Sequence, residues 1–200
     1  MNYETWSPVY EQILSDFGFG READERARDV LADLTDPFDL ADLDVSGETV
    51  AIAGAGPSLT DPVDSRRPDE LARAREADAV FAASSAADHL READVRVDCM
   101  VTDLDKNPET ASELTREGVP VAAHAHGDNV PAVTDHVPTF DGEFVLPTTQ
   151  AAPSGPVRNP GGFTDGDRAA FLADHLGAAE LRFVGWDFDD PAVGPEKARK

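Results

Sequence analysis

The stretch Cys99-Met100-Val101-Thr102-Asp103-Leu104-Asp105 places two carboxylates two residues apart directly after a short apolar run. Such a run predicts a buried strand. In extended backbone, residues i and i+2 point to the same side, so we expect Asp103 and Asp105 to converge. Converging carboxylates repel each other unless a cation lies between them. Because oxygen ligands suit Mg²⁺, which usually also binds substrate phosphates, the stretch predicts a Mg²⁺–nucleotide site; a ligand-free acidic loop is the alternative.

Short apolar runs alternate with helical segments from residue 47 onward. Besides the Cys99 run, strands are expected at 49–53, 79–83, 119–123, 143–146 and 180–185. Helices are expected at 68–77, 86–92, 108–117 and 166–176. This alternation predicts an α/β fold with a Rossmann-like, mostly parallel, doubly wound sheet. Ligands of such folds bind outside the carboxyl ends of the strands, where most polar clusters of this sequence lie.

Residues 1–46 have a helical pattern and are expected to form an N-terminal helical extension to a Rossmann-like domain spanning 47–200. Apolar residues recur at helical spacing up to Phe17, and a second helix is expected from about Arg21 to Leu34. The aromatic residues of this region are expected to pack, and no chemistry is predicted there.

The 200 residues carry a net charge of −23, from 40 acidic and 17 basic residues spread along the chain. This composition is typical of haloarchaeal proteins, whose self-repulsion is screened because the Debye length is roughly 3 Å at 1 M salt. The charge argues against nucleic-acid binding, which needs a basic surface. Cys99 is the only cysteine, so no disulfide framework is predicted. Neither a signal sequence nor a long apolar run is seen, so we expect a cytoplasmic protein with no membrane partner.

A glycine-rich turn, Gly54-Ala55-Gly56-Pro57-Ser58-Leu59, follows the first expected strand. Its glycines would let the backbone approach a phosphate, to which the amides and the Ser58 hydroxyl would donate. It lacks the third glycine of the dinucleotide fingerprint and the lysine of a P-loop. A phosphate cradle and a tight turn are therefore equally favoured.

The segment His124-Ala125-His126-Gly127-Asp128-Asn129 follows the strand expected at 119–123. Its His-x-His-x-Asp pattern is similar to part of a zinc hydrolase site, which would need another histidine at Asn129. We favour Asp128 as a third acid near Asp103 and Asp105, with His126 and Asn129 as polar contacts to a substrate.

The segment 159–168 joins a glycine turn to the start of a helix. Thr164 or Asp165 suits an N-cap, and Arg168 on the first turn would reach an anionic phosphate. The preceding loop, 151–162, is a candidate lid. After the last expected strand, Asp187, Asp189 and Asp190 are expected to form a solvated acidic turn.

Together, these segments resemble the archaeal 6-hydroxymethyl-7,8-dihydropterin pyrophosphokinase family, whose domain also occurs in Maf-type glycosyltransferases. The matching pieces are 54–59, 101–105, 124–129, 148–150, 161–169 and 185–188. The resemblance implies Mg²⁺-dependent transfer of diphosphate from ATP to the pterin hydroxymethyl group, with release of AMP. One departure puts a metal or nucleotide contact in doubt, because Ser84-Ser85 stands where the family tends to have Asp-Gly.

The resemblance also implies roles for individual residues. Metal ligands would be Asp103, Asp105 and Asp128. Nucleotide and phosphate contacts would be Gly54, Gly56, Pro57, Ser58, Thr102, Thr164 and Asp165. Pterin contacts would be Asn129, Gln150, Gly162 and Phe163. Candidate catalytic residues would be Asp128, His126 and Arg168, with Asp128 and His126 both candidates for the general base.

Three alternatives stay open at this point: a nucleotide-sugar-binding or glycosyltransferase-like member of the same family, a zinc hydrolase, and an interaction module. Bound zinc would distinguish the hydrolase. The sequence leaves the oligomeric state open, and an exposed apolar face on the first helix would indicate a homodimer. The family is expected to continue into another helix beyond Lys200.

Overall fold

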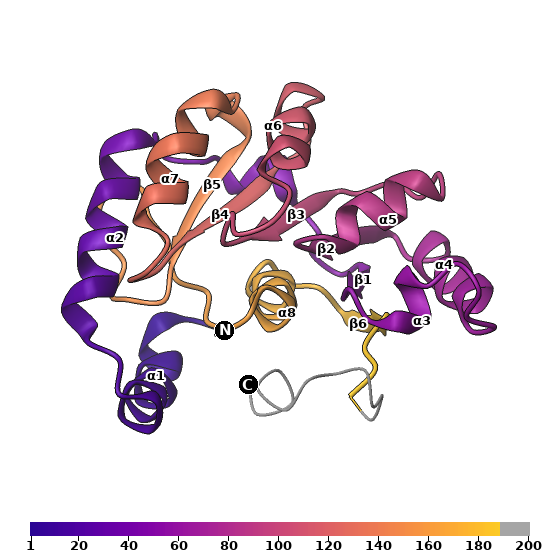
Figure 1. The fold of residues 1–200 in the computed structure, drawn as a ribbon, viewed down its shortest axis with the longest axis horizontal. Helices are drawn as coiled ribbons and strands as arrows, with labels where there is room; N and C mark the ends of the chain where they lie inside the picture. The colour runs from indigo at the N-terminus through magenta and orange to yellow at the C-terminus, as the bar shows by residue number, and fades with distance from the viewer. Residues whose placement is uncertain (189–200) are drawn as a thin grey trace.

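The sheet is the centre of the molecule, and a computed structural model describes it within residues 1–188 of the chain (Figure 1). Its strands are β1 Thr49–Ala53, β2 Ala79–Ala83, β3 Cys99–Thr102, β4 Val121–Ala125, β5 Val145–Thr149 and β6 Glu180–Val184. Their order is β5-β4-β3-β2-β1-β6, and every neighbouring pair is parallel. The predicted Rossmann-like α/β fold is therefore confirmed, and the described sheet is parallel throughout.

Helices cover both faces of this sheet. They are α1 Tyr3–Phe17, α2 Arg21–Leu34, α3 Pro57–Thr60, α4 Arg67–Arg75, α5 Ala86–Glu92, α6 Pro108–Arg116, α7 Val130–His136 and α8 Asp165–His175. Short 3₁₀ turns lie at Leu40–Leu43, Val137–Thr139 and Gly142–Phe144. The expected helices lie within two residues of these bounds, whereas the short helix α7 was not predicted.

The two faces of the sheet have separate apolar cores. On one face, α2 and α4–α7 pack against alternate strand residues, and α2 contributes Ala27 and Leu31. On the other face, α8 packs with residues 38–45 against the intervening strand residues. Figure 1 shows α8 on the opposite side of the sheet from α5, α6 and α7. Because β1 to β5 are buried on both faces, they read as nearly continuous apolar runs, whereas the edge strand β6 is partly exposed.

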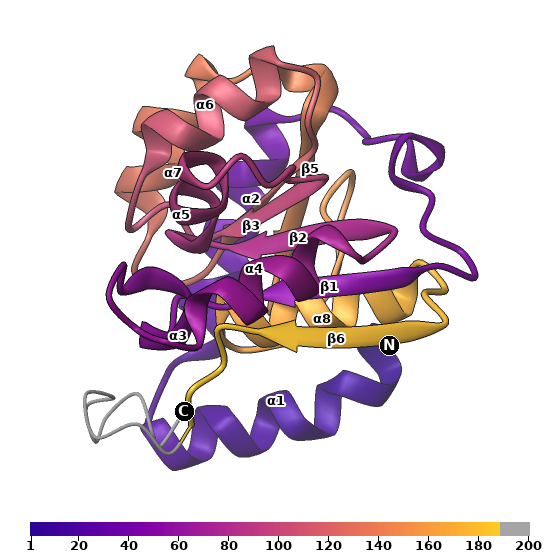
Figure 2. The same ribbon diagram turned by 90° about the vertical axis from the view of Figure 1, so that its right-hand side faces the viewer.

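Helix α1 lies along the outside of α8, as Figure 2 shows. Trp6 meets Phe171 of α8 with ring centroids 5.9 Å apart, in a cluster that also buries Tyr10 and Leu14. The aromatic residues of the extension therefore pack, as expected. Among the described helices, none is long and apolar enough to cross a bilayer.

Strand β4 begins two residues later than predicted. Gly118 has a positive φ of 82°, and the amide of Val119 still bonds back to Leu114 of α6. Pro120 has no amide to donate to a ladder. These features hold residues 118–120 in the turn, so His124 lies within β4 rather than after it.

The connections of β4 and β5 leave the sheet toward opposite faces. The chain passes from β1 through β5 with its crossover helices on one face, and then returns through α8 on the other face to β6. Ligands of open α/β sheets bind at such a switch point, outside the carboxyl ends of the strands. The topology therefore predicts a ligand site near the carboxyl ends of β3, β4 and β5.

Candidate active site

A sharp turn follows β3 and brings two carboxylates together. Leu104 has a left-handed φ of 65° although it is not a glycine, and its side chain is buried. The Thr102 hydroxyl accepts a hydrogen bond from the amide of Leu104 at 3.0 Å. Asp103 and Asp105 converge as predicted, but the extended backbone assumed for them was wrong. The buried Leu104 side chain and the Thr102 bond hold the chain in the turn instead.

The third carboxylate of this cluster comes from α8. Oxygens of Asp103, Asp105 and Asp165 lie within 4.8 Å of one another. Asp165 is the first residue of α8, after the N-cap Thr164. Among residues 1–188, no other group of three or more acidic, histidine or cysteine side chains is arranged to hold a metal ion.

Asp128, predicted as the third acid, lies outside this cluster. Its side chain is 89% exposed, and its Oδ1 is 2.5 Å from Nδ1 of His126. His126 in turn places Nε2 3.4 Å from Asp103 Oδ2. The structure therefore links Asp128 to the carboxylates only through the His126 ring.

The side chain of Asn129 explains why Asp128 turns outward. Its Oδ1 accepts from the His126 amide at 2.9 Å, and its Nδ2 donates to the carbonyls of Asp103 and His124 at 2.7 Å each. These bonds fold residues 126–129 into a tight loop against the end of β3. The polar atoms of Asn129 are engaged within the protein, so this geometry does not support the predicted contact with pterin.

Arg168 is buried beside the carboxylate cluster. Its Nη1 lies 2.9 Å from Asp165 and 3.8 Å from Asp103, and its Nη2 donates to Oε1 of Gln150 at 3.4 Å. The guanidinium therefore offsets part of the negative charge of the cluster. Gln150 is buried and bonded at both ends, since its Nε2 donates to Asp24 at 3.0 Å.

The three carboxyls respond differently to their surroundings. Burial opposes ionisation of Asp103, but the hydrogen bond with His126 and the charge of Arg168 outweigh it and hold the pKa below its ordinary value. Burial, together with the neighbouring Asp103, raises the pKa of Asp105. Burial raises the pKa of Asp165 to about 7, against the opposing effect of Arg168. Negative charge is thus crowded at this point, and a cation would relieve it.

The donor set of the cluster fits a hard divalent cation. Asp103, Asp105 and Asp165 offer carboxylate oxygens, and Mg²⁺ prefers oxygen ligands and usually keeps several waters. His124, His126 and Asp128 do not form a comparable group among the described residues. The geometry therefore fits the predicted magnesium better than the zinc alternative.

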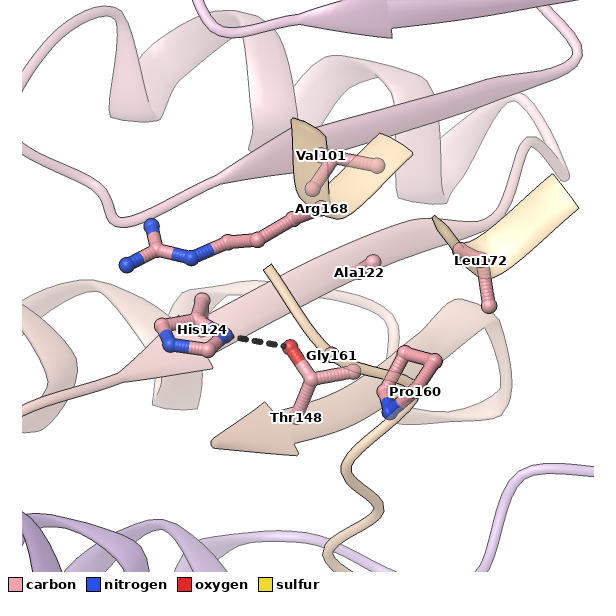
Figure 3. A pocket seen from close by; sticks show the side chains of 8 residues that line it. All are labelled: Val101, Ala122, His124, Thr148, Pro160, Gly161, Arg168 and Leu172. Atoms are coloured by element: carbon pink, nitrogen blue, oxygen red, sulfur yellow. Dashed lines mark hydrogen bonds between the residues drawn. The ribbon is translucent and has the colours of Figure 1, made fainter. Parts of the chain in front are cut away.

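A small pocket lies beneath the cluster, on the α8 face of the sheet (Figure 3). Its lining residues are Val101, Ala122, His124, Thr148, Pro160, Gly161, Arg168 and Leu172. The cavity measures about 10 Å³, which is room for about one water molecule. Figure 3 shows the Arg168 guanidinium and the His124 ring facing this space.

The bonding of His124 fixes its tautomer. The Thr148 hydroxyl donates to the carbonyl of Ala123 at 3.3 Å, so it accepts from Nδ1 of His124 at 3.1 Å. Burial lowers the pKa of His124 well below 6.5, which keeps the ring neutral. Nε2 of His124 and Nε of Arg168 have no partner among the described residues. The pocket therefore presents one acceptor and one donor.

The glycine-rich loop after β1 is closed by the end of β6. The amides of Gly54 and Gly56 donate to the carbonyls of Val184 and Gly185, each at 2.9 Å. The amide of Ser58 donates to Asp187 at 2.7 Å, and Pro57 begins the four-residue α3. The amides predicted to cradle phosphate are thus already bonded within the protein.

Asp187 was expected in a solvated turn, and that expectation was wrong. Its side chain is 7% exposed and also pairs with Arg66 at 2.9 Å. The reason is that its carboxylate accepts a hydrogen bond from the amide of Ser58, in the loop after β1. Asp189 and Asp190 lie outside the described residues.

The remaining predicted residues lie around the start of α8. Gly162 has φ 103°, and a Cβ there would lie 2.6 Å from Cα of Arg168. Phe163 packs against Phe17 with ring centroids 5.5 Å apart, and Thr164 bonds to Asp167. Ser84 instead follows β2; it is buried with φ 49°, and its amide donates to the carbonyl of Val101 in β3. Gly162, Phe163 and Thr164 therefore fix the entry of α8, which positions Asp165 and Arg168.

One buried polar residue next to the site was not predicted. Asp24 of α2 is 4% exposed and accepts hydrogen bonds from Tyr10, Gly127 and Gln150. A signal was present, because Asp24 shares the helical spacing of the buried Ala27 and Leu31. An acid on an apolar helix face needs hydrogen-bonding partners.

The parallel sheet and the three carboxylates beside its switch point define a Rossmann-like α/β protein with a candidate ligand-binding site made of acidic residues. The model of the family described as 6-hydroxymethylpterin diphosphokinase MptE-like matches residues 27–192. The chain therefore belongs to this family, and the resemblance seen in the sequence is confirmed.

Curated archaeal relatives cover most of the chain, and each is named 6-hydroxymethyl-7,8-dihydropterin pyrophosphokinase. The Methanothermobacter thermautotrophicus protein is 41% identical over 196 residues, which are 95% of this chain and 80% of that protein. The Pyrococcus furiosus protein is 37% identical, covering 94% of this chain and 79% of its own. The Methanocaldococcus jannaschii protein is 33% identical, covering 94% and 80%.

Proposed function

We propose that this chain transfers diphosphate from ATP to 6-hydroxymethyl-7,8-dihydropterin in a Mg²⁺-dependent reaction that releases AMP. Membership of the family and the names of the three relatives support the pterin pyrophosphokinase activity. The observation that carries the metal and nucleotide part is the cluster of Asp103, Asp105 and Asp165. A further cation would stabilise three carboxylates that, among the described residues, have only Arg168 as a neighbouring guanidinium.

The cluster would hold Mg²⁺ through its carboxylate oxygens. The chemistry that Mg²⁺ would supply there is positive charge for the phosphates of ATP and for the departing AMP. Arg168 fixes Asp165 by a 2.9 Å ion pair and limits its repulsion from Asp103. The protein's own contribution is thus mainly positioning and charge.

His126 and Asp128 are the candidates for taking the proton of the pterin hydroxymethyl group. They form one hydrogen-bonded pair at 2.5 Å, and the other side of the His126 ring faces Asp103. A base in this pair would lie beside the proposed metal ligands, which would suit an attack on a phosphate bound there.

The test is AMP release from ATP and Mg²⁺ with and without 6-hydroxymethyl-7,8-dihydropterin, over a series of KCl concentrations. We expect AMP to form only with pterin and to stop with EDTA. ADP in place of AMP would show phosphoryl transfer and overturn the proposal. No turnover from folded protein would favour the nucleotide-sugar alternative, which binding of nucleotide sugars would then test.

A further inference from the structure

The buried Asp24 carboxylate gathers donors from three parts of the chain. Its Oδ1 accepts from the backbone amide of Gly127 at 2.7 Å. Its Oδ2 accepts from the Tyr10 hydroxyl at 2.7 Å and from Nε2 of Gln150 at 3.0 Å. Burial, and then the bond with Asp24, raises the pKa of Tyr10, so the phenol stays a donor. A buried carboxylate with several donors holds them in a defined geometry.

One branch from Asp24 leads to the His126 ring. Gly127 directly follows His126, whose Nε2 is 3.4 Å from Asp103. A Cβ on Gly127 would lie 2.7 Å from Cβ of Ala23 and 3.2 Å from Asp24 Oδ1. The loop that carries His126 therefore lies directly against α2, and the Asp24 bond fixes its position.

The other branch leads to Arg168. Oε1 of Gln150 accepts a hydrogen bond from Nη2 of Arg168 at 3.4 Å, and Nε2 of Gln150 donates to Asp24. This bond orients the Gln150 amide, because a flipped amide would turn its NH₂ toward the guanidinium. Arg168 then pairs with Asp165 at 2.9 Å. Asp24 is thus joined to both sides of the carboxylate cluster.

We propose that Asp24 is a positioning residue that holds His126 and Arg168 at the cluster. Helix α2 is in this way part of the active-site framework, since it supplies Asp24. The kinetic consequence rests on the proposed function. The effect on the 126–129 loop does not, and it is measured separately.

The first variant is Asp24→Asn, which keeps the shape but replaces one acceptor oxygen with an NH₂ group. That group would face the donors of Tyr10 and Gln150. We expect kcat for pterin-dependent AMP release to fall about 10- to 100-fold, because an error of about 1 Å in the placement of a catalytic group has an effect of this size. The KM for ATP is expected to change less than about threefold.

The matched control is Tyr10→Phe. It removes one donor to the same carboxylate and leaves the bonds to Gly127 and Gln150 in place. We expect kcat within about twofold of wild type. An equal loss in Tyr10→Phe and Asp24→Asn would show a general packing effect and overturn the positioning role.

A double variant tests the geometry by exchanging donor and acceptor. In Asp24→Asn combined with Gln150→Glu, the amide at position 24 donates to the carboxylate at position 150, which still accepts from Arg168. The amide oxygen still accepts from Gly127, so the network is complete again. We expect kcat to recover at least about fivefold over Asp24→Asn, and failure to recover would contradict the proposal.

Hydrogen exchange at the Gly127 amide gives a readout that does not depend on catalysis. We expect exchange at least about 10-fold faster in Asp24→Asn than in wild type, with the sheet amides unchanged. If Asp24→Asn does not fold, Gly127→Ala pushes the same loop away from α2 and is expected to lower kcat similarly. An inactive wild type would refute the proposed function alone, whereas unchanged Gly127 exchange in Asp24→Asn would refute the positioning role.

Discussion

Two turns leave the same edge of the sheet and differ in how their polar groups are satisfied. In the turn after β1, the amides of Gly54, Gly56 and Ser58 all donate to the end of β6. In the turn after β3, Asp103 and Asp105 crowd against Asp165 with partial compensation from Arg168. These three amides of the first turn are bonded within the protein, whereas the second turn has an excess of negative charge.

This difference indicates that the glycine-rich turn after β1 stabilises the fold, whereas the carboxylates after β3 are suited to binding a ligand. The glycines of the first turn are explained by close contact, since a Cβ at Gly56 would lie 2.5 Å from the carbonyl oxygen of Gly185. The carboxylates of the second turn have no such explanation, and groups with displaced pKa values gather at functional sites. We therefore expect substitutions in the turn after β3 to lower activity, and substitutions in the turn after β1 to lower stability.

The largest effect is expected for Asp103→Asn. It removes a charge from the cluster and a partner from His126, so we expect pterin-dependent AMP release to fall at least about 100-fold, in line with several kcal/mol of charge stabilisation. Initial rates over a Mg²⁺ titration would measure this. The matched control is Asp135→Asn, which changes an exposed acid of α7. Full activity of Asp103→Asn at limiting Mg²⁺ would refute the metal assignment.

Gly56→Ala tests the other side of the comparison. Its new methyl would meet backbone of Gly185 and the Asp187 carboxylate at 2.6 Å, so we expect a loss of about 1–3 kcal/mol in the free energy of unfolding. Urea denaturation would measure it. Gly142→Ala, with no atom within 4 Å of the added methyl, is the control and should stay within about 0.5 kcal/mol. Equal stability of the two variants would show that the β1 turn is not a packed junction.

A smaller effect is expected from the neutral His124 beside the cluster. Its folded-state pKa lies well below 6.5, so below about pH 6.5 the unfolded chain binds a proton that the folded chain does not. His124 therefore lowers stability as pH falls, by at most about 1.4 kcal/mol per pH unit, and contributes no such loss above that pH.

His124→Asn removes this proton linkage and keeps a donor near Thr148. Unfolding free energies between pH 5 and 6.5 should then show a pH slope smaller than that of wild type by about 1 kcal/mol per unit on average. An unchanged slope in His124→Asn would mean that the ring is protonated in the folded protein.

The sequence predicted the existence and order of the strands because most of them are short apolar runs between helical segments. It placed the strand before Thr148 at 143–146, whereas Gly142–Phe144 is a 3₁₀ turn and β5 spans Val145–Thr149. It predicted the convergence of Asp103 and Asp105 because they are neighbours on one segment. It misplaced the start of β4, since Val119 and Pro120 have strand-like side chains but their backbone belongs to the turn after α6. It also assigned Asp128 to the cluster, although the Asn129 bonds turn that side chain outward.

The sequence by itself determined the α/β fold, the family and the acidic turn after β3, because these depend on local periodicity and contiguous motifs. Only the tertiary structure decided that Asp165 completes the cluster and that Asp24 lies behind it. Asp165 stands 62 positions after Asp103, and Asp24 lies 79 positions before it. Distances between segments so far apart are set by how the helices pack on the sheet, and spacing along the chain does not encode them.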